Sequence, residues 1–218
     1  MSALGRPRLH LREIDSTNRR ARELAAQGAP HGTLVTAGAQ TAGRGRQGRR
    51  WDAPPGSALL CSLIVRDVDA LLSLRAGLAV ADVAGEPARV KWPNDVLVDG
   101  RKVAGVLVEG RPQDGWAVIG IGVNVSAAPA EVPGAAALGR ADVEAVLAEL
   151  LAALETRLAE PPAATLTALR ARDALLGAAV RWEGGSGVGD GIDADGGLRV
   201  RIEAGDVTVL SAGEVHLG

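Results

Sequence analysis

Residues 88–110 read ARVKWPNDVLVDGRKVAGVLVEG and contain more informative side chains than any other part of the chain. Valine-rich runs stand on both sides of Asp99-Gly100, a residue pair that favours the tight turn of a β-hairpin. Pro93, followed by two polar residues, interrupts the first run, as happens at a bulge or at the end of a strand. The stretch therefore predicts paired strands with an interruption that faces a functional site.

This region also contains the only two lysines among 24 basic residues, Lys91 and Lys102. Because arginine supplies charge everywhere else, these positions indicate sites that need a compact ammonium group. Lys102 begins an apolar strand, where an ammonium is costly unless an anion or an acid meets it. Gly105 follows and permits close approach of the backbone. The alternative, a turn stabilised by its Asn and Asp, would leave Lys91 and Trp92 without a role.

The second informative stretch is the loop 41–56, TAGRGRQGRRWDAPPG. Its GRGRQG segment matches the G-x-G-x-x-G pattern, but the two prolines that follow cannot form the helix that a dinucleotide-binding turn requires. A P-loop is excluded too, since no Gly-Lys-Ser/Thr follows. We favour a flexible anion-binding loop, with arginines as forked donors. The alternative is a solvated basic loop; the flanking Gln40 and Trp51 favour closure over a ligand.

The third stretch is Ser16-Thr17-Asn18, which precedes a helical segment that ends at Gly28. A helix N-cap needs only one side-chain hydroxyl or amide. Three consecutive hydrogen-bonding side chains exceed that need, and a small polar ligand could use the others. Taken alone, the segment favours a plain cap.

The rest of the chain predicts an α+β main domain with a small β appendage. Strands are expected within 32–40, 58–66 and 115–125, and helices within 70–85, 141–160 and 165–176. From about residue 177, short alternating strands separated by glycines predict a small β-barrel. We place the domains at 1–174 and 175–218.

Composition excludes several classes of protein. No apolar run is long enough to span a membrane, and the N-terminus lacks the apolar core of a signal peptide. The net charge of −2 gives no general attraction to nucleic acid. Cys61 is the single cysteine and lies in the apolar run ALLCSLIV, so we expect a small buried core residue in a reducing cytoplasm. The three histidines are too scattered for a structural metal site.

Taken together, the motifs resemble those of biotin protein ligases. Asp-Ser-Thr-Asn at 15–18, Gln-Thr-Ala-Gly-Arg-Gly-Arg at 40–46 and Lys-Trp-Pro-Asn-Asp at 91–95 occur in the family's order. Lys-x-Ala-Gly-x-Leu-x-Glu at 102–109 and Gly-x-Gly-x-Asn at 120–124 follow them. The tail at 187–198 is similar to the family's C-terminal domain, so the resemblance covers most of the chain.

The resemblance implies a mixed β-sheet backed by helices, the class II synthetase-like fold of biotin and lipoate ligases, with a C-terminal SH3-like β-barrel. It implies formation of biotinyl-5'-AMP from biotin and MgATP, then transfer of biotin to a lysine of a biotin carboxyl carrier protein domain of a biotin-dependent carboxylase. Only about a dozen residues precede the Ser-Thr-Asn helix, so the winged-helix domain of repressor-type ligases is not expected. We therefore expect no DNA or membrane partner, and a weak homodimer stays open.

Site residues follow from the resemblance position by position. The residues implied to bind biotin are Ser16, Thr17, Asn18, Gln40, Arg44, Gly45, Arg46, Lys102, Trp51 and Gly105. The residues implied to bind ATP are Arg44, Arg46, Arg49, Lys91, Asn94, Asp95 and Asn124. Lys102 and Arg46 are the implied catalytic pair, and Asn94 or Asp95 would lie near Mg²⁺. Asn124 would contact adenine beside the alanine-rich loop 126–138, which has no aromatic residue for stacking.

Two other functions remain open. Lipoate ligases share the fold and chemistry, although the Gly-Arg-Gly-Arg loop and Lys-Trp-Pro-Asn-Asp argue against them. A nucleic-acid-binding module could use the arginine loop, but it would also need a broad basic face and stacking aromatics. The chain is slightly acidic and has four Trp with no Phe or Tyr.

Overall fold

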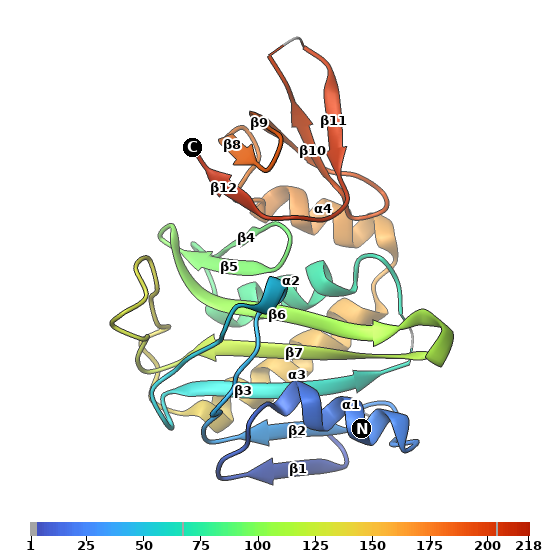
Figure 1. The fold of residues 1–218 in the computed structure, drawn as a ribbon, viewed down its shortest axis with the longest axis vertical. Coiled ribbons are helices and arrows are strands. Elements are labelled where there is room, and N and C mark those ends of the chain that lie inside the picture. The colour runs from blue at the N-terminus through green and yellow to red at the C-terminus, as the bar shows by residue number, and fades with distance from the viewer. Residues whose placement is uncertain (1–3, 67, 204) are drawn as a thin grey trace.

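The computed structural model describes residues 4–66, 68–203 and 205–218, and it contains two β-sheets (Figure 1). The larger sheet has seven strands in the order β1-β2-β3-β7-β6-β5-β4. Its strands are β1 (Arg8–Leu11), β2 (Leu34–Ala37), β3 (Ala58–Val65), β4 (Arg89–Lys91), β5 (Asp95–Val98), β6 (Arg101–Arg111) and β7 (Trp116–Asn124). Only β1 and β2 pair in parallel, so the sheet is mixed, as the sequence predicted.

The sheet's local structure follows from the sequence at two places. All eight residues of β3 are buried, which explains its continuous apolar run around Cys61. Asp99 and Gly100 have positive φ angles of 50° and 72°, the geometry of a two-residue hairpin turn between β5 and β6. The predicted turn is confirmed, and it sets the register of the two strands that carry Asp95 and Lys102.

Helices cover both faces of the larger sheet. They are α1 (Thr17–Ala26), α2 (Leu72–Ala84), α3 (Val143–Ala159) and α4 (Pro162–Arg172), with short 3-10 turns η1 (Arg46–Gly48) and η2 (Pro112–Asp114). Helix α1 packs on one face over a small core that includes Ala21, Val35 and Val118. Helices α2 and α3 pack together on the opposite face over the main core (Figure 1).

Two helix boundaries show how far local signals reach. Ser16 caps α1 by accepting from the Arg19 backbone N–H, as predicted. The last helix was expected at 165–176, but it begins at Pro162 and ends at Arg172. Proline is well suited to a first helical turn. Beyond the helix, Ala174 N donates to Val90 O, so the chain is held in extended form beside β4.

The C-terminal residues form a five-stranded antiparallel sheet in the order β11-β10-β9-β8-β12 (Figure 1). Its strands are β8 (Ala179–Trp182), β9 (Gly185–Ile192), β10 (Leu198–Arg201), β11 (Val207–Leu210) and β12 (Val215–Leu217). Strands β11 and β12 are its edges; among the described residues they do not pair, so the barrel expected from the sequence is seen here as an open sheet.

The two sheets share one hydrophobic core. Leu175, Val180, Leu198 and Val215 belong to the same buried cluster as the interior of the larger sheet. The domain boundary at 174/175 therefore remains a prediction. Among the described residues, no helix has the length and apolar character of a membrane span.

Candidate functional site

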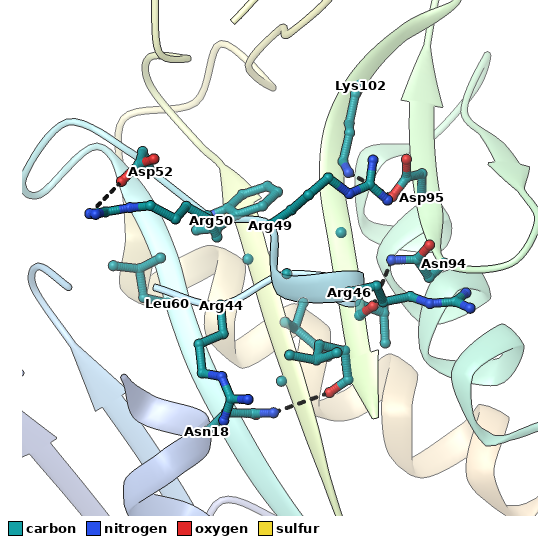
Figure 2. Close-up of a pocket in the computed structure, with 18 of the residues that line it drawn as sticks. Asn18, Arg44, Arg46, Arg49, Arg50, Asp52, Leu60, Asn94, Asp95 and Lys102 are labelled. Carbon is teal, nitrogen blue, oxygen red and sulfur yellow. Dashed lines mark hydrogen bonds and ion pairs between the residues drawn. The ribbon is translucent and has the colours of Figure 1, made fainter. Parts of the chain in front are cut away.

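A cavity of about 340 Å³ opens on the face of the larger sheet that carries α1. Its walls come from the start of α1, the loop 40–52, strands β3 and β5–β7, and the loop after β7 (Figure 2). The cavity brings together every residue that the sequence predicted for biotin or ATP: Ser16, Thr17, Asn18, Gln40, Arg44, Gly45, Arg46, Arg49, Trp51, Lys91, Asn94, Asp95, Lys102, Gly105 and Asn124. Their individual roles stay predictions.

One end of the cavity is lined by neutral hydrogen-bonding groups. Gln40 Oε1 accepts from the backbone N–H of Thr17 at 2.7 Å and from its hydroxyl at 3.0 Å. Ser62 Oγ lies 2.9 Å from Thr17 Oγ1 and 2.8 Å from Asn18 Oδ1. Ser16, Thr17, Asn18 and Ser62 are all buried. The Ser-Thr-Asn segment therefore makes more hydrogen bonds than a helix cap needs, whereas the sequence alone favoured a plain cap.

These contacts leave acceptor lone pairs for a ligand. The amide oxygens of Gln40 and Asn18 only accept, and they receive the Thr17 backbone N–H and the Ser62 hydroxyl respectively. The Thr17 hydroxyl has one hydrogen, which it can donate to either Gln40 or Ser62. Hydroxyl and amide oxygens each have two lone pairs, so this end of the cavity suits a ligand that donates.

Trp51 forms an apolar wall next to this polar end. A Cβ atom at Gly122 would lie 2.4 Å from the Trp51 ring, and one at Gly105 would lie 3.2 Å from it. The two glycines therefore let the indole lie directly on strands β6 and β7. The indole Nε1 is buried and has no hydrogen-bond partner in the described structure. A ligand acceptor in the cavity would satisfy this donor.

The arginine loop closes over the cavity from outside the sheet. Gly45 N donates to Arg49 O at 2.7 Å, and the turn η1 between them includes Gln47 with a φ of 53°. No α-helix follows the glycines, which confirms that this is not a dinucleotide-binding turn. Burial lowers the pKa of the Arg46 guanidinium, and the charge of neighbouring Arg49 lowers that pKa further. Arg46 remains charged at neutral pH.

The loop also contacts the C-terminal sheet. Arg46 Nη2 donates to Gly213 O at 3.4 Å, and Arg49 forms an ion pair with Glu214. Glu214 itself lines the cavity. The segment before β12 thus belongs to the site, although no sequence signal pointed to it.

Lys102 Nζ forms an ion pair with Asp95 Oδ1 at 2.7 Å, and the two side chains face one another from β6 and β5 (Figure 2). Lys102 Nζ also lies 5.7 Å from the centroid of the Trp51 ring. The sequence predicted that an anion or an acid must meet this ammonium, and the structure identifies Asp95 as that acid.

In the Lys-Trp-Pro-Asn-Asp segment, Lys91 ends β4, Asp95 begins β5, and residues 92–94 form a turn between them. The predicted interruption at a strand end is confirmed, and the alternative of a turn, set aside on the sequence, also applies. Trp92 has a structural role in this turn. Its side chain is buried, and its Nε1 donates to Gly196 O of the C-terminal sheet at 2.9 Å. Asn94 Nδ2 donates to Val106 O at 2.9 Å, which fixes the turn to β6. The turn therefore presents Lys91, Asn94 and Asp95 to the cavity while its tryptophan joins the two sheets.

The loop after β7 forms the remaining wall. Asn124 Nδ2 donates to Ala136 O at 2.9 Å, while Asn124 Oδ1 is buried and has no partner among the described residues. Pro129, Val132 and Ala135 line the cavity beside it. This wall is aliphatic, as the alanine-rich sequence predicted, and it offers one unused amide oxygen.

The cavity is rich in positive charge. It is lined by the cations Arg44, Arg46, Arg49, Arg50, Lys91 and Lys102 and by the acids Asp52, Asp95 and Glu214. Within the part of the chain that the structure describes, no three His, Cys, Asp or Glu side chains gather to hold a metal ion. The arrangement thus favours a polyanionic ligand, with its charge met by guanidinium and ammonium groups.

Sequence reasoning assigned no role to Ser62 or Glu214, which line the cavity, or to Glu109, which contacts two residues that line it. Ser62 had one local signal, a hydroxyl inside the apolar run of β3. Glu109 accepts from Asn18 Nδ2 at 2.7 Å and pairs with Arg44 at 3.3 Å. Cys61, by contrast, is buried as expected, and burial raises the pKa of its thiol to about 12.

Known proteins share this fold and these segments. The model of the biotin/lipoate A/B protein ligase family matches residues 11–126. The chain is 40% identical to the biotin–acetyl-CoA-carboxylase ligase of Mycobacterium tuberculosis, over 94% of this chain and 87% of that protein. It is 36% identical to the ligase of the same name from Paracoccus denitrificans, over 95% of this chain and 99% of that protein.

A solved structure shows the same fold. It is the biotin protein ligase of Aquifex aeolicus in complex with biotin and ATP, with a TM-score of 0.84 and 28% identity. The match covers 98% of this chain and 100% of that one. On the family model, the two curated relatives and this structural match, the chain belongs to the biotin/lipoate A/B protein ligase family.

Proposed function

We propose that this chain is a biotin–carboxyl-carrier-protein ligase that makes biotinyl-5'-AMP from biotin and ATP and transfers biotin to a carrier lysine. One observation supports this most directly: a single cavity joins a neutral hydrogen-bonding end to a cation-rich end. A ligand with an uncharged polar ring and a carboxylate fits the first end, and a nucleotide polyphosphate fits the second. Its two relatives by sequence are named biotin–acetyl-CoA-carboxylase ligases.

The acceptor oxygens of Thr17, Ser62 and Asn18 favour biotin over lipoate. Biotin's ureido ring carries two N–H groups that can donate to the free lone pairs of these oxygens. The dithiolane ring of lipoate has no N–H and would leave these oxygens without a ligand donor. Sites that present buried polar groups discriminate strongly against ligands that cannot pair them. Trp51 provides the apolar surface for the rest of the bicyclic ring.

In the first step, a biotin carboxylate oxygen attacks the α-phosphorus of ATP, the bond to the β-phosphoryl group breaks, and pyrophosphate leaves. The step brings like charges together, so fixed cations near the reacting atoms lower its barrier. We assign this role to Lys102 and Arg46, and the binding of the remaining phosphates to Arg44, Arg49 and Lys91, because all five line the cavity. Asn124 Oδ1 accepts from the adenine amino group.

In the second step, the amine of the carrier lysine attacks the acyl carbon, an amide forms, and AMP leaves while the amine proton passes to solvent. Hydrolysis of the adenylate competes with this transfer. The arginine loop opposes hydrolysis by covering the intermediate and excluding water.

The donor set fits a magnesium ion that arrives with ATP. Mg²⁺ is usually held by one or two protein oxygens together with substrate phosphates and water, not by a dedicated protein cage. Asp95 offers a carboxylate, and the hydrogen bond of Asn94 uses its nitrogen and leaves its oxygen. When bound with ATP, Mg²⁺ neutralises charge on the departing pyrophosphate. A reaction that consumes ATP, in a chain with one reduced cysteine, fits a cytoplasmic location.

The test is transfer of radiolabelled biotin to a purified biotin carboxyl carrier domain, with MgATP present or omitted. We expect label on the carrier only with MgATP, and no labelling when lipoate and a lipoyl domain replace biotin and its carrier. Thermal stabilisation by biotin plus MgATP, but not by lipoate or an oligonucleotide, is the supporting measurement. Labelling of the lipoyl domain alone would reassign the chain to the lipoate ligases.

A further inference from the structure

We propose that Glu109 is a positioning residue that couples the biotin head-group pocket to the arginine loop, an inference that rests on the proposed function. Its side chain is 18% exposed and lies on β6 beside α1. Its Oε2 accepts from Asn18 Nδ2 at 2.7 Å. Its Oε1 lies 3.3 Å from both Arg22 Nη1 and Arg44 Nη1. One carboxylate thus joins the pocket, the helix and the loop.

The contact with Asn18 determines which way that amide faces. A carboxylate only accepts hydrogen bonds, so Asn18 must turn its NH₂ group toward Glu109. Asn18 Oδ1 then faces Ser62, at 2.8 Å, where it acts as an acceptor. Asn18 is only 4% exposed, so neither end of its amide can rely on water. Glu109 thereby maintains the acceptor set that selects a donating ring.

Space for this arrangement comes from the neighbouring strand. A Cβ atom at Gly120 would lie 2.2 Å from Asn18 Oδ1, so only glycine leaves room for the amide there. The orientation of Asn18 is thus fixed by Glu109 on one side and permitted by Gly120 on the other.

The contact with Arg44 tethers the loop. The side chain of Arg44 is 46% exposed, so the pair adds little to overall stability. Its effect is on position instead, because Arg44 begins the segment that covers the cavity and forms an isolated bridge with Arg50. The carboxylate of Glu109 holds this end of the loop against β6.

Substitution of Glu109 can separate the two roles. Glu109→Gln keeps an oxygen that can accept from Asn18, but its neutral amide no longer attracts Arg44 and Arg22. Asn18 is buried whereas the two arginines can be hydrated, so the new amide oxygen should serve Asn18. Glu109→Ala removes both contacts. The matched controls are Arg22→Ala, which removes only the third partner, and Glu23→Gln, a surface change on the same helix.

The experiment measures biotin affinity by calorimetry and the release rate of biotinyl-AMP after a single turnover, with melting curves for every variant. We expect Glu109→Gln to keep biotin affinity within about threefold and to release the adenylate about tenfold faster. Glu109→Ala should also weaken biotin binding about tenfold, the scale of one buried hydrogen bond. Both controls should match the original chain.

Two results would overturn the inference: adenylate release at the original rate in Glu109→Gln, or equal loss of biotin affinity in Glu109→Gln and Glu109→Ala. If Glu109→Ala fails to fold, the release rate and biotin affinity of Glu109→Gln decide the question. The unaltered chain distinguishes this inference from the proposed function. If it forms no biotinyl-AMP at all, the proposed function fails; if it does and the variants behave like it, only the role of Glu109 fails.

Discussion

Lys102 and Asp95 form an ion pair, at 2.7 Å, across the hairpin of β5 and β6. The register of the two strands puts Asp95 opposite Gly105 and Lys102 opposite Leu97, so the two side chains approach one another diagonally. The Lys102 side chain packs beside Gly105, where a Cβ would lie 3.4 Å from its Nζ, at van der Waals contact. The ammonium is thereby held in the cavity before a substrate enters, and it remains 35% exposed and accessible to one.

Lys102→Ala should therefore lower the rate of biotinyl-AMP formation by roughly 10²–10³, the usual scale for one donor that stabilises developing charge. Lys102→Arg should not restore the rate, because a planar guanidinium is larger and directs its donors differently. Single-turnover formation of biotinyl-AMP is the measurement. The alanine variant should still melt cooperatively, within a few degrees of the original, since a partly exposed pair contributes about 1 kcal/mol or less. An arginine variant of normal rate would reduce Lys102 to a general source of charge.

Glu214→Gln should lower the KM for ATP by up to about fivefold. Glu214 pairs with Arg49 at the cavity, so a polyphosphate must displace its carboxylate to reach that guanidinium. The pair is half-exposed, with side-chain exposures of 53% and 33%, which limits the effect to about 1 kcal/mol. Glu183→Gln, a change at an exposed residue in the turn between β8 and β9, is the control. A raised KM would show instead that Glu214 holds Arg49 in its productive position.

Arg46→Gly should release biotinyl-AMP faster while some adenylation persists. Arg46 reaches from the loop to Gly213 O, and its loss leaves the cover without that contact. Free adenylate should then label lysines of a bystander such as serum albumin. The chain has only two lysines, so its own labelling should stay slight. Unchanged release of the intermediate would remove the loop from the role of a cover.

Gly122→Ala should weaken biotin binding more than Gly105→Ala does. The new methyl group would lie 2.4 Å from the Trp51 ring in the first case and 3.2 Å in the second. The methyl group of Gly122→Ala would displace the indole from the cavity wall. The contact made by Gly105→Ala would be relieved by a shift of a few tenths of an ångström. Titration of tryptophan fluorescence with biotin would compare the two affinities. Equal affinities would argue that Trp51 is not part of the biotin wall.

Cys61 should be inert to iodoacetamide at pH 8 in the folded chain and reactive in denaturant. Burial raises the pKa of its thiol from 9.0 to about 12, so the folded state disfavours the thiolate. The resulting stability is complete below pH 9 and is lost as the pH rises from about 9 to about 12. Between pH 8 and pH 10, the free energy of unfolding should fall by about 1.4 kcal/mol more than in Cys61→Ala. Identical pH profiles would show that the thiol ionises freely.

Much of the architecture could be predicted because its signals are local. Ser16 and Gly28 bound α1 through cap chemistry, and Asp99-Gly100 fixes a hairpin through positive φ angles. The continuous apolar run of β3 indicated a buried strand. The predicted site residues could be collected from short motifs, since each motif keeps its members adjacent in the chain. That these residues line one cavity could be seen only from the tertiary structure, in which the strands that carry them pair.

The sequence by itself thus indicated the family, the start of α1 and the hairpin between β5 and β6. Tertiary structure alone decided which acid meets Lys102, what Glu109 orients, and why Trp92 is buried. Asn18 and Glu109 are 91 positions apart, and Arg49 and Glu214 are 165 apart. Local preferences act over a few residues, so they say nothing about such pairs. These contacts form because burial of one shared core brings both sheets and the loop together, and buried polar groups must then find their partners in whatever that packing places beside them.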